Sequence, residues 1–431
     1  MTDFIIRGVR VIDAAQDQIA DVGINDGRIS AVEPTLSENA PVEVDGRGLA
    51  LFPGGIDPHV HFNQPGRTDW EGLSSGTAAL AKGGMTSFFD MPLNSSPVTT
   101  TVAAFDDKRR LMDAHARVNG YLWGGLVPGN LADLAGLAER GVIGFKAFMS
   151  NSGIDEFQTA DDATIYRGMQ TLAPLGKILA VHAENDSITG ALAAEARNAG
   201  RLGVRDYLNS RPAIAEIEAI QRLIFFAGET GCKLHIVHVS TGRGVDLVAQ
   251  ARAQGVDVTC ETCPHYLVLT DEDVERLGAV AKCAPPIREA HEQAALWEKL
   301  ADGTLPMVAS DHSPAPMDLK QGQDFFAIWG GIAGCQSTLS LLLTYGYHAH
   351  RLTLSQIAAV TSYNTAQRFG LPSKGAIQPG MDADLTLVNL DAEYILTAEM
   401  LEYRHKISPY VGLPLRGNIV KTWVGGKQVY G

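Results

Sequence analysis

The sequence has few cysteines, a deficit of positive charge and no long hydrophobic run. Five cysteines among 431 residues are an odd number, which does not suit a disulfide framework and fits a reducing compartment. With 49 acidic and 35 basic side chains the net charge is -14, which argues against nucleic acid or an anionic membrane as a partner. The nearest approach to an apolar segment, residues 339–343, is far too short to cross a bilayer.

The first residues also lack a cationic segment followed by an apolar core, which a secretory signal needs. We therefore expect a cytoplasmic protein. Cys260 and Cys263 form a Cys-x-x-Cys pair, but a structural zinc site needs a second ligand pair at short spacing, and only the isolated Cys283 follows. We expect these residues to be ordinary buried thiols.

Short apolar runs alternate with longer stretches whose apolar residues recur at helical spacing. The runs cover residues 55–61, 86–92, 120–127, 143–149, 178–184, 234–240, 256–263 and 307–312. Alternation of this kind indicates a parallel sheet, and eight strands over this length predict a (β/α)8 TIM-like barrel. An open doubly wound sheet is the alternative, but it needs a glycine-rich phosphate turn after its first strand, and this chain has none there. No nucleotide cofactor is expected for the same reason.

The two ends of the chain have a different pattern, with alternating apolar and polar residues and an Asp-Gly turn signal at 26–27. Such half-sheets can pair into one small domain. We therefore predict a β-sandwich domain made of residues 1–50 and 373–431, interrupted by a barrel of residues 51–372.

Two histidines one residue apart, His59 and His61, close the first apolar run. Residues two apart on a strand point to the same face, so both imidazoles converge while Val60 faces the other way. Imidazole is a common ligand of zinc and related metals. The pair therefore predicts a metal site at the end of the first strand.

Four more side chains stand at strand ends, where barrel enzymes carry their chemistry. They are Lys146 on the fourth run, His182 on the fifth, His238 on the sixth and Asp311 on the eighth. Strand alternation lets all four point inward with the histidine pair. By the same rule His235 and His312 are predicted to face helices or loops. The remaining histidines considered are predicted to be surface or hydrogen-bonded residues: His115, His291, His348 and His350.

Lys146 is an unusual neighbour for a metal centre, because a cationic amine would be repelled there. Reaction of the amine with carbon dioxide gives a carbamate, which is an anionic oxygen ligand. The position of Lys146 on the fourth strand, between the histidine pair and the single histidines, favours this modified form over a solvated amine.

The order His-x-His, Lys, His, His and Asp along the strands resembles the amidohydrolase superfamily, in the binuclear cyclic-amidase branch of hydantoinases, dihydropyrimidinases, dihydroorotases and allantoinases. The segment 375–384, which leads back into the terminal domain, fits as well, so the resemblance covers essentially the whole chain. It implies one metal held by His59, His61 and Asp311, a second held by His182 and His238, and carbamylated Lys146 bridging them. It also implies that Asp311 shuttles a proton from the attacking water to the departing ring nitrogen.

Within this branch, segments 90–94, 329–334 and 402–412 look most like allantoinases. Hydantoinases and dihydropyrimidinases usually have a tyrosine five residues after the carbamylated lysine, where this chain has Asn151. Dihydroorotases place an arginine directly after the first histidines, whereas Arg67 lies further away. The resemblance therefore implies hydrolysis of allantoin to allantoate, a step of purine breakdown. A hydantoinase or dihydropyrimidinase, a dihydroorotase and a non-catalytic scaffold that has lost its metals are the alternatives.

Candidate contacts to such a substrate are Asn94, Asn151, Arg67 and Trp329. The primary amide of Asn94 offers both a donor and an acceptor to a cyclic amide, although the residue also suits a turn. Arg288 is interpreted as bracing a loop. The ligand types fit two zinc ions, with manganese, cobalt or iron as alternatives, and the relatives imply a homotetramer.

Overall fold

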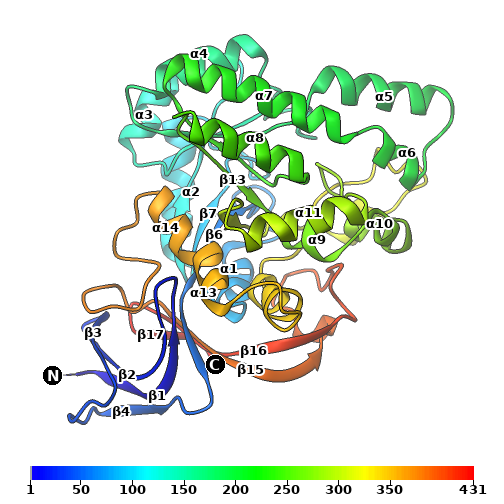
Figure 1. Ribbon diagram of the computed structural model, residues 1–431. Coiled ribbons are helices and arrows are strands. Elements are labelled where there is room, and N and C mark those ends of the chain that lie inside the picture. The colour runs from blue at the N-terminus through cyan, green and yellow to red at the C-terminus, as the bar shows by residue number, and fades with distance from the viewer. Residues whose placement is uncertain (1) are drawn as a thin grey trace.

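Nine short strands between residues 55 and 308 run parallel and are surrounded by helices in the computed structural model, which describes residues 2–431 (Figure 1). They form two sheets. The first contains β6 (Gly55–Val60), β7 (Met85–Asp90) and β8 (Asn119–Leu122). The second contains β9 (Gly124–Gly125), β10 (Phe145–Phe148), β11 (Ile178–His182), β12 (Lys233–Ile236), β13 (Val258–Thr262) and β14 (Met307–Val308).

Two links join these sheets. β8 and β9 are consecutive pieces of one run of chain, separated at Trp123. On the other side, a parallel bridge between Val60 and His312 connects the end of β6 to the segment after β14, and the His61 N–H donates to the His312 carbonyl at 2.7 Å. All eight predicted runs contain strand, and the predicted fold class is confirmed.

The longer helices pack outside the strands and return the chain from one strand to the next. Several begin with a side chain that caps their free backbone N–H groups, such as Asn185, which accepts from Ile188 N at 3.1 Å directly after β11. The α-helices are α1 (Leu73–Lys82), α2 (Val102–His115), α3 (Leu134–Glu139), α4 (Asp162–Leu172), α5 (Asp186–Asn198), α6 (Val204–Asn209), α7 (Ala213–Thr230), α8 (Gly242–Ala253), α9 (Pro264–Val268), α10 (Asp271–Leu277), α11 (Ala290–Ala301), α12 (Thr338–Leu341), α13 (Leu354–Ala358) and α14 (Asn364–Arg368).

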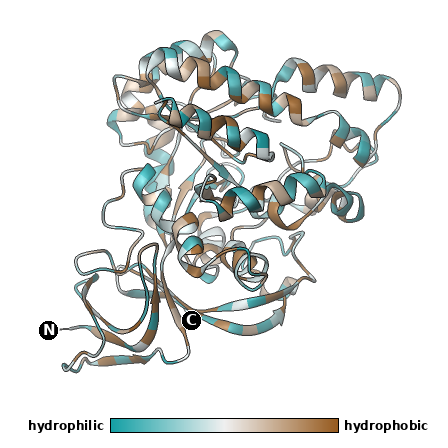
Figure 2. Cartoon of the chain, in the orientation of Figure 1, coloured by the Kyte–Doolittle hydropathy of each residue, from teal (hydrophilic) through white to brown (hydrophobic). Residues whose placement is uncertain are grey.

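Hydrophobic and hydrophilic residues alternate along these outer helices, as Figure 2 shows. None of the helices within residues 2–431 is long and apolar enough to span a membrane.

Segments from the two ends of the chain form one mixed sheet beside the barrel, at the bottom of Figure 1. Its strand order is β17-β16-β15-β5-β1-β2-β3, with β4 also paired to β1. The bounds are β1 (Phe4–Ile12), β2 (Asp17–Asn25), β3 (Arg28–Glu33), β4 (Val42–Asp45), β5 (Ala50–Pro53), β15 (Leu385–Ile395), β16 (Pro414–Val424) and β17 (Lys427–Tyr430). Apolar side chains from both ends share one buried cluster, in which Phe4 stacks on Trp423 with ring centroids 5.8 Å apart. Hydrophobic burial thus joins the first strand to strands from the C-terminal end of the chain.

Candidate metal centre and active site

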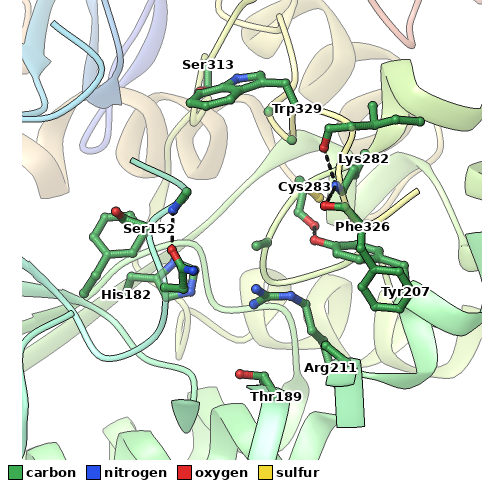
Figure 3. Close-up of a pocket in the computed structure, with 18 of the residues that line it drawn as sticks. Ser152, His182, Thr189, Tyr207, Arg211, Lys282, Cys283, Ser313, Phe326 and Trp329 are labelled. Atoms are coloured by element: carbon green, nitrogen blue, oxygen red, sulfur yellow. Dashed lines mark hydrogen bonds between the residues drawn. The ribbon is translucent and has the colours of Figure 1, made fainter. Parts of the chain in front are cut away.

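A cavity of about 370 Å³ opens at the carboxyl ends of the barrel strands. Figure 3 shows part of its wall, with His182 on one side and Tyr207 and Lys282 on the other. The five predicted histidine and aspartate ligands line it, and all are buried: His59, His61, His182, His238 and Asp311.

Three of these residues meet around one point. The Asp311 Oδ1 atom lies 3.3 Å from His59 Nε2 and 3.3 Å from His61 Nε2. Two ligands on one tetrahedral zinc ion, each about 2.0–2.1 Å from it, are separated by roughly 3.3 Å. The spacing of these donor atoms therefore suits a single divalent cation.

A second pair of donors lies next to the first group. His182 Nδ1 and His238 Nε2 are 3.1 Å apart, which again suits two ligands on one ion. The rings of His59 and His238 have centroids 5.3 Å apart, so the two groups of donors are adjacent. His182 and His238 are therefore candidate ligands of a cation next to the first group.

Lys146 on β10 has the features that a carbamate ligand needs. Its side chain is fully buried, and its Nζ atom has no hydrogen-bond partner among the described residues. Burial lowers the pKa of Lys146 to about 7, opposed by the charges of Asp311 and Glu261. A large fraction of the amine is therefore neutral near pH 7, and only the neutral amine reacts with carbon dioxide.

Burial also favours the neutral form of two imidazoles of the site, His59 and His238. Burial and the nearby Lys146 charge lower the pKa values of His59 and His238 well below the ordinary value. Neutral imidazole is the form that binds metal. Together with the unpartnered Lys146 amine, these donors fit a pair of divalent cations.

Carboxylates behind the imidazoles decide which ring nitrogens face the cavity. His59 Nδ1 lies 2.7 Å from Glu261 Oε1, and His182 Nε2 lies 2.8 Å from Glu184 Oε2. If each of these nitrogens carries the proton and donates it, His59 Nε2 and His182 Nδ1 are free to bind metal. These are the same atoms that face the other donors.

Left-handed backbone conformations turn three residues into the cavity. Asn94, His238 and Asp311 have φ values of 72°, 40° and 46°. Such values are uncommon outside glycine and are found more often at functional sites. His238 and Asp311 lie beyond the last residues of β12 and β14, so the chain turn, rather than the strand alternation used for the prediction, directs them inward.

The family of the chain follows from whole-length comparisons. A model of the amidohydrolase family matches residues 50–429. The chain belongs to this family. It is 55% identical to an allantoinase of Rubrobacter xylanophilus over 99% of this chain and 94% of that protein, and 53% identical to an allantoinase of Solibacter usitatus over 100% and 94%. Among solved structures, an L-hydantoinase (dihydropyrimidinase) from Arthrobacter aurescens is 34% identical with a TM-score of 0.97, covering 100% of this chain and 96% of that one.

The predicted substrate contacts of this amidohydrolase divide into two groups. Asn94, Asn151 and Trp329 line the cavity. Asn94 donates to Ser313 Oγ at 3.2 Å, and the Trp329 Nε1–H has no partner within residues 2–431. The structure does not bring Arg67 into the lining, because its guanidinium donates to Glu156 at 3.0 Å and to the Asn94 carbonyl at 3.4 Å.

The prediction for His235 was wrong. Its Nε2 lies 3.0 Å from Glu261 Oε2, so it supports the carboxylate that contacts His59. The apolar neighbours Leu234 and Ile236 pack in the large outer core instead. Strand alternation puts His235 opposite to His238, but the chain turns between Ile236 and His238, and the turn reverses the faces.

Other expectations were confirmed. Within the described chain all five cysteines are free and buried. His312 packs between Phe62 and Tyr403, away from the cavity, and its Nδ1 accepts from Gly334 N at 3.1 Å. His115, His291 and His350 are exposed and His348 is partly exposed.

Sequence reasoning missed the residues that support the donors, namely Glu184, Glu261 and Arg211. Glu261 stands on the inward face of β13, where strand parity applied to carboxylates would have found it, whereas Glu184 lies beyond the end of β11 and is marked only by its place two residues after His182. Arg211 lies between α6 and α7 and has no local signal. It reaches the cavity only because these helices fold over the strand ends.

Proposed function

We propose that this amidohydrolase hydrolyses the ring amide of allantoin to give allantoate. The observation that carries the proposal is its similarity to allantoinases, 42–55% identical over 99% or more of the chain. Buried, neutral donors around a cavity at the strand ends support a hydrolytic, metal-dependent reaction.

The proposal assigns His59, His61 and Asp311 to one cation and His182 and His238 to a second, with carbamylated Lys146 between them. Two divalent cations, when bound, supply a nucleophilic water near neutral pH and polarise the carbonyl of the substrate. Zinc fits these ligands best, and manganese, cobalt and iron also accept imidazole and carboxylate.

Asp311 then has a second role as the proton shuttle. Its Oδ1 atom faces both His59 Nε2 and His61 Nε2 at 3.3 Å, and its side chain borders the cavity. A carboxylate at this position accepts the proton of the attacking water and returns it to the ring nitrogen as the amide bond breaks.

The proposal also covers the domain organisation, the oligomeric state and the location of the protein. Residues 1–50 and 373–431 form one β-domain around a barrel domain of residues 51–372. The protein acts as a homotetramer, as the family resemblance implies. Its free cysteines agree with a reducing, cytoplasmic location.

Hydrolysis rates measured side by side on allantoin, unsubstituted hydantoin, dihydrouracil and dihydroorotate test the substrate. We expect kcat/KM for allantoin to exceed that for hydantoin at least about a hundredfold, or roughly 2.7 kcal/mol in transition-state binding. Faster turnover of dihydrouracil than of allantoin would refute the proposal and favour a dihydropyrimidinase. The high TM-score to a hydantoinase makes this the informative competitor.

A further inference from the structure

Arg211 brings a guanidinium group into the wall of the cavity. Figure 3 shows it reaching from the helical side toward His182, with Thr189 and Tyr207 nearby. Its Nη1 atom donates to Glu184 Oε2, the same oxygen that lies 2.8 Å from His182 Nε2. Within residues 2–431, Nε and Nη2 of Arg211 make no hydrogen bond and are not fully buried, so their N–H groups remain free for a ligand in the cavity.

The other cations along the cavity are engaged elsewhere. Arg197 is half-exposed and pairs with Asp324 at 2.8 Å. Lys282 donates to the carbonyls of Phe326 and Ile328, and its Nζ atom lies 4.7 Å from the ring centroid of Tyr207. Arg211 therefore differs from Lys282 in keeping N–H groups free toward the cavity, and from Arg197 in being largely buried, with a side chain 15% exposed against 52%.

The guanidinium is held in place before any ligand arrives. Arg288 donates to the backbone carbonyl of Arg211, and the Arg211 side chain packs over the ring of Tyr207 at 5.7 Å. The Tyr207 hydroxyl donates in turn to the Cys283 carbonyl at 2.9 Å. Such preorganisation reduces the entropy lost when a ligand binds.

The position of Arg211 suits a substituent on the substrate ring rather than the reacting amide itself. The path from the metal-facing nitrogen of His182 to the guanidinium of Arg211 crosses the imidazole ring and two hydrogen bonds that share one oxygen of Glu184. This path is roughly 7 Å long. A substituent of a few atoms on the ring carbon next to the attacked carbonyl spans such a gap. The ureido arm of allantoin is a substituent of this kind.

The charge of Arg211 also determines which chemical group of a ligand it binds best. Its charge is compensated by the fully buried carboxylate of Glu184, which pairs directly with the guanidinium. A paired guanidinium offers N–H donors with little net positive charge. It therefore suits a neutral carbonyl oxygen better than a carboxylate, which would have to approach the negative charge of Glu184.

We propose that Arg211 is a specificity-determining residue that donates to the carbonyl oxygen of the ureido arm. This inference rests on the proposed function and explains how the cavity separates allantoin from hydantoins with apolar substituents. A substrate with an apolar substituent binds less well, because it displaces water from the Arg211 donors and offers them no acceptor.

The test compares kcat/KM for three hydantoins that differ only in the substituent. Allantoin carries the ureido arm, 5-isobutylhydantoin carries an apolar group of the same branching and number of non-hydrogen atoms, and 5-carboxymethylhydantoin carries a carboxylate. Each is measured with the wild-type holoenzyme and with Arg211→Met, Arg211→Lys and Glu184→Gln. Metal content and Tm are measured for every variant.

We expect Arg211→Met to lower the ratio of kcat/KM for allantoin to that for 5-isobutylhydantoin by about 10- to 100-fold. Arg211→Lys keeps a cation beside Glu184 but loses the planar fork, so it should retain more metal and still show a lowered ratio. Glu184→Gln disturbs His182 while keeping the guanidinium, so both substrates should slow by a similar factor and the ratio should stay within about threefold of wild type.

Equal slowing of allantoin and 5-isobutylhydantoin in both Arg211 variants would overturn the inference and leave Arg211 with a structural role through Glu184. A larger loss on 5-carboxymethylhydantoin than on allantoin would overturn it as well, because Arg211 would then bind an anion. Failure of the proposed function appears separately, in the wild-type protein, as turnover of dihydrouracil faster than that of allantoin.

Discussion

Replacing Lys146 by alanine tests the most unusual part of the proposed centre. The side chain is fully buried, and burial lowers its pKa from 10.5 to about 7. At pH 7 about half of such amines are neutral, against roughly one in 3,000 for an ordinary lysine, which makes the amine more than a thousandfold more available to carbon dioxide. The burial of Lys146 thus supports the proposed carbamate.

The Lys146→Ala protein should lose metal and activity together. A shared anionic ligand supports the Lewis-acid effect, which contributes several kcal/mol to the transition state. Loss of about 4 kcal/mol corresponds to roughly a thousandfold fall in kcat/KM. The vacated space once held the flexible stem of a lysine plus a carboxylate, so short acids should enter it and restore part of the activity.

The assay measures allantoin hydrolysis and metal content of Lys146→Ala across a series of added acids, acetate, propionate and butyrate, with propylamine as the matched control. Rescue should rise with chain length as the acid fills the space, and propylamine should have no effect. Full metal occupancy with substantial activity in the unsupplemented variant would refute the carbamate, as would rescue by propylamine equal to that by propionate.

Three further outcomes are expected. Asp311→Asn keeps a coordinating oxygen but cannot accept a proton near neutral pH, so activity should fall by about two to four orders of magnitude with metal largely retained; metal analysis beside kinetics checks this, and an active, metal-loaded variant would exclude the shuttle role. Lys374→Met removes the buried cation that lies 2.6 Å from Asp384 and leaves that carboxylate with Asn119 and Gly425 as donors. We expect the free energy of unfolding measured in urea to fall by about 3 kcal/mol. An equal fall in the exposed control Lys427→Met would contradict this reasoning. Stripping metal with a chelator should lower the Tm, because cations that bind only the folded protein stabilise it by mass action, and zinc should restore the Tm; a metal-free protein with an unchanged Tm would argue against bound structural cations.

Local periodicity predicted much of the site. His59 lies on β6 and His61 directly follows its last residue, and both face Asp311 as the alternation of side chains predicts; His182, the last residue of β11, lies inward by the same rule. The same reasoning failed for His235, because β12 ends at Ile236 and the backbone of His238 turns into a left-handed conformation. Strand parity holds only as far as the strand continues.

Residues distant in sequence were beyond this kind of prediction. The Glu261 carboxylate meets both His59 and His235, and Arg211 meets Glu184 from a different helical segment. Strand parity places Glu261 on the inward face of β13, but the partners in both contacts depend on how strands and helices are brought together. Arg67 shows the converse, because its place near the first histidines in sequence did not bring it into the cavity.

The sequence by itself determined the alternation of strands and helices and the kinds of donor available at the strand ends, because both follow from residue chemistry and short-range periodicity. Only the tertiary structure decided which donors meet and which imidazole nitrogens face the cavity. It also lowers the pKa of Lys146 to about 7, because an amine loses its ordinary pKa only when the whole fold removes it from water.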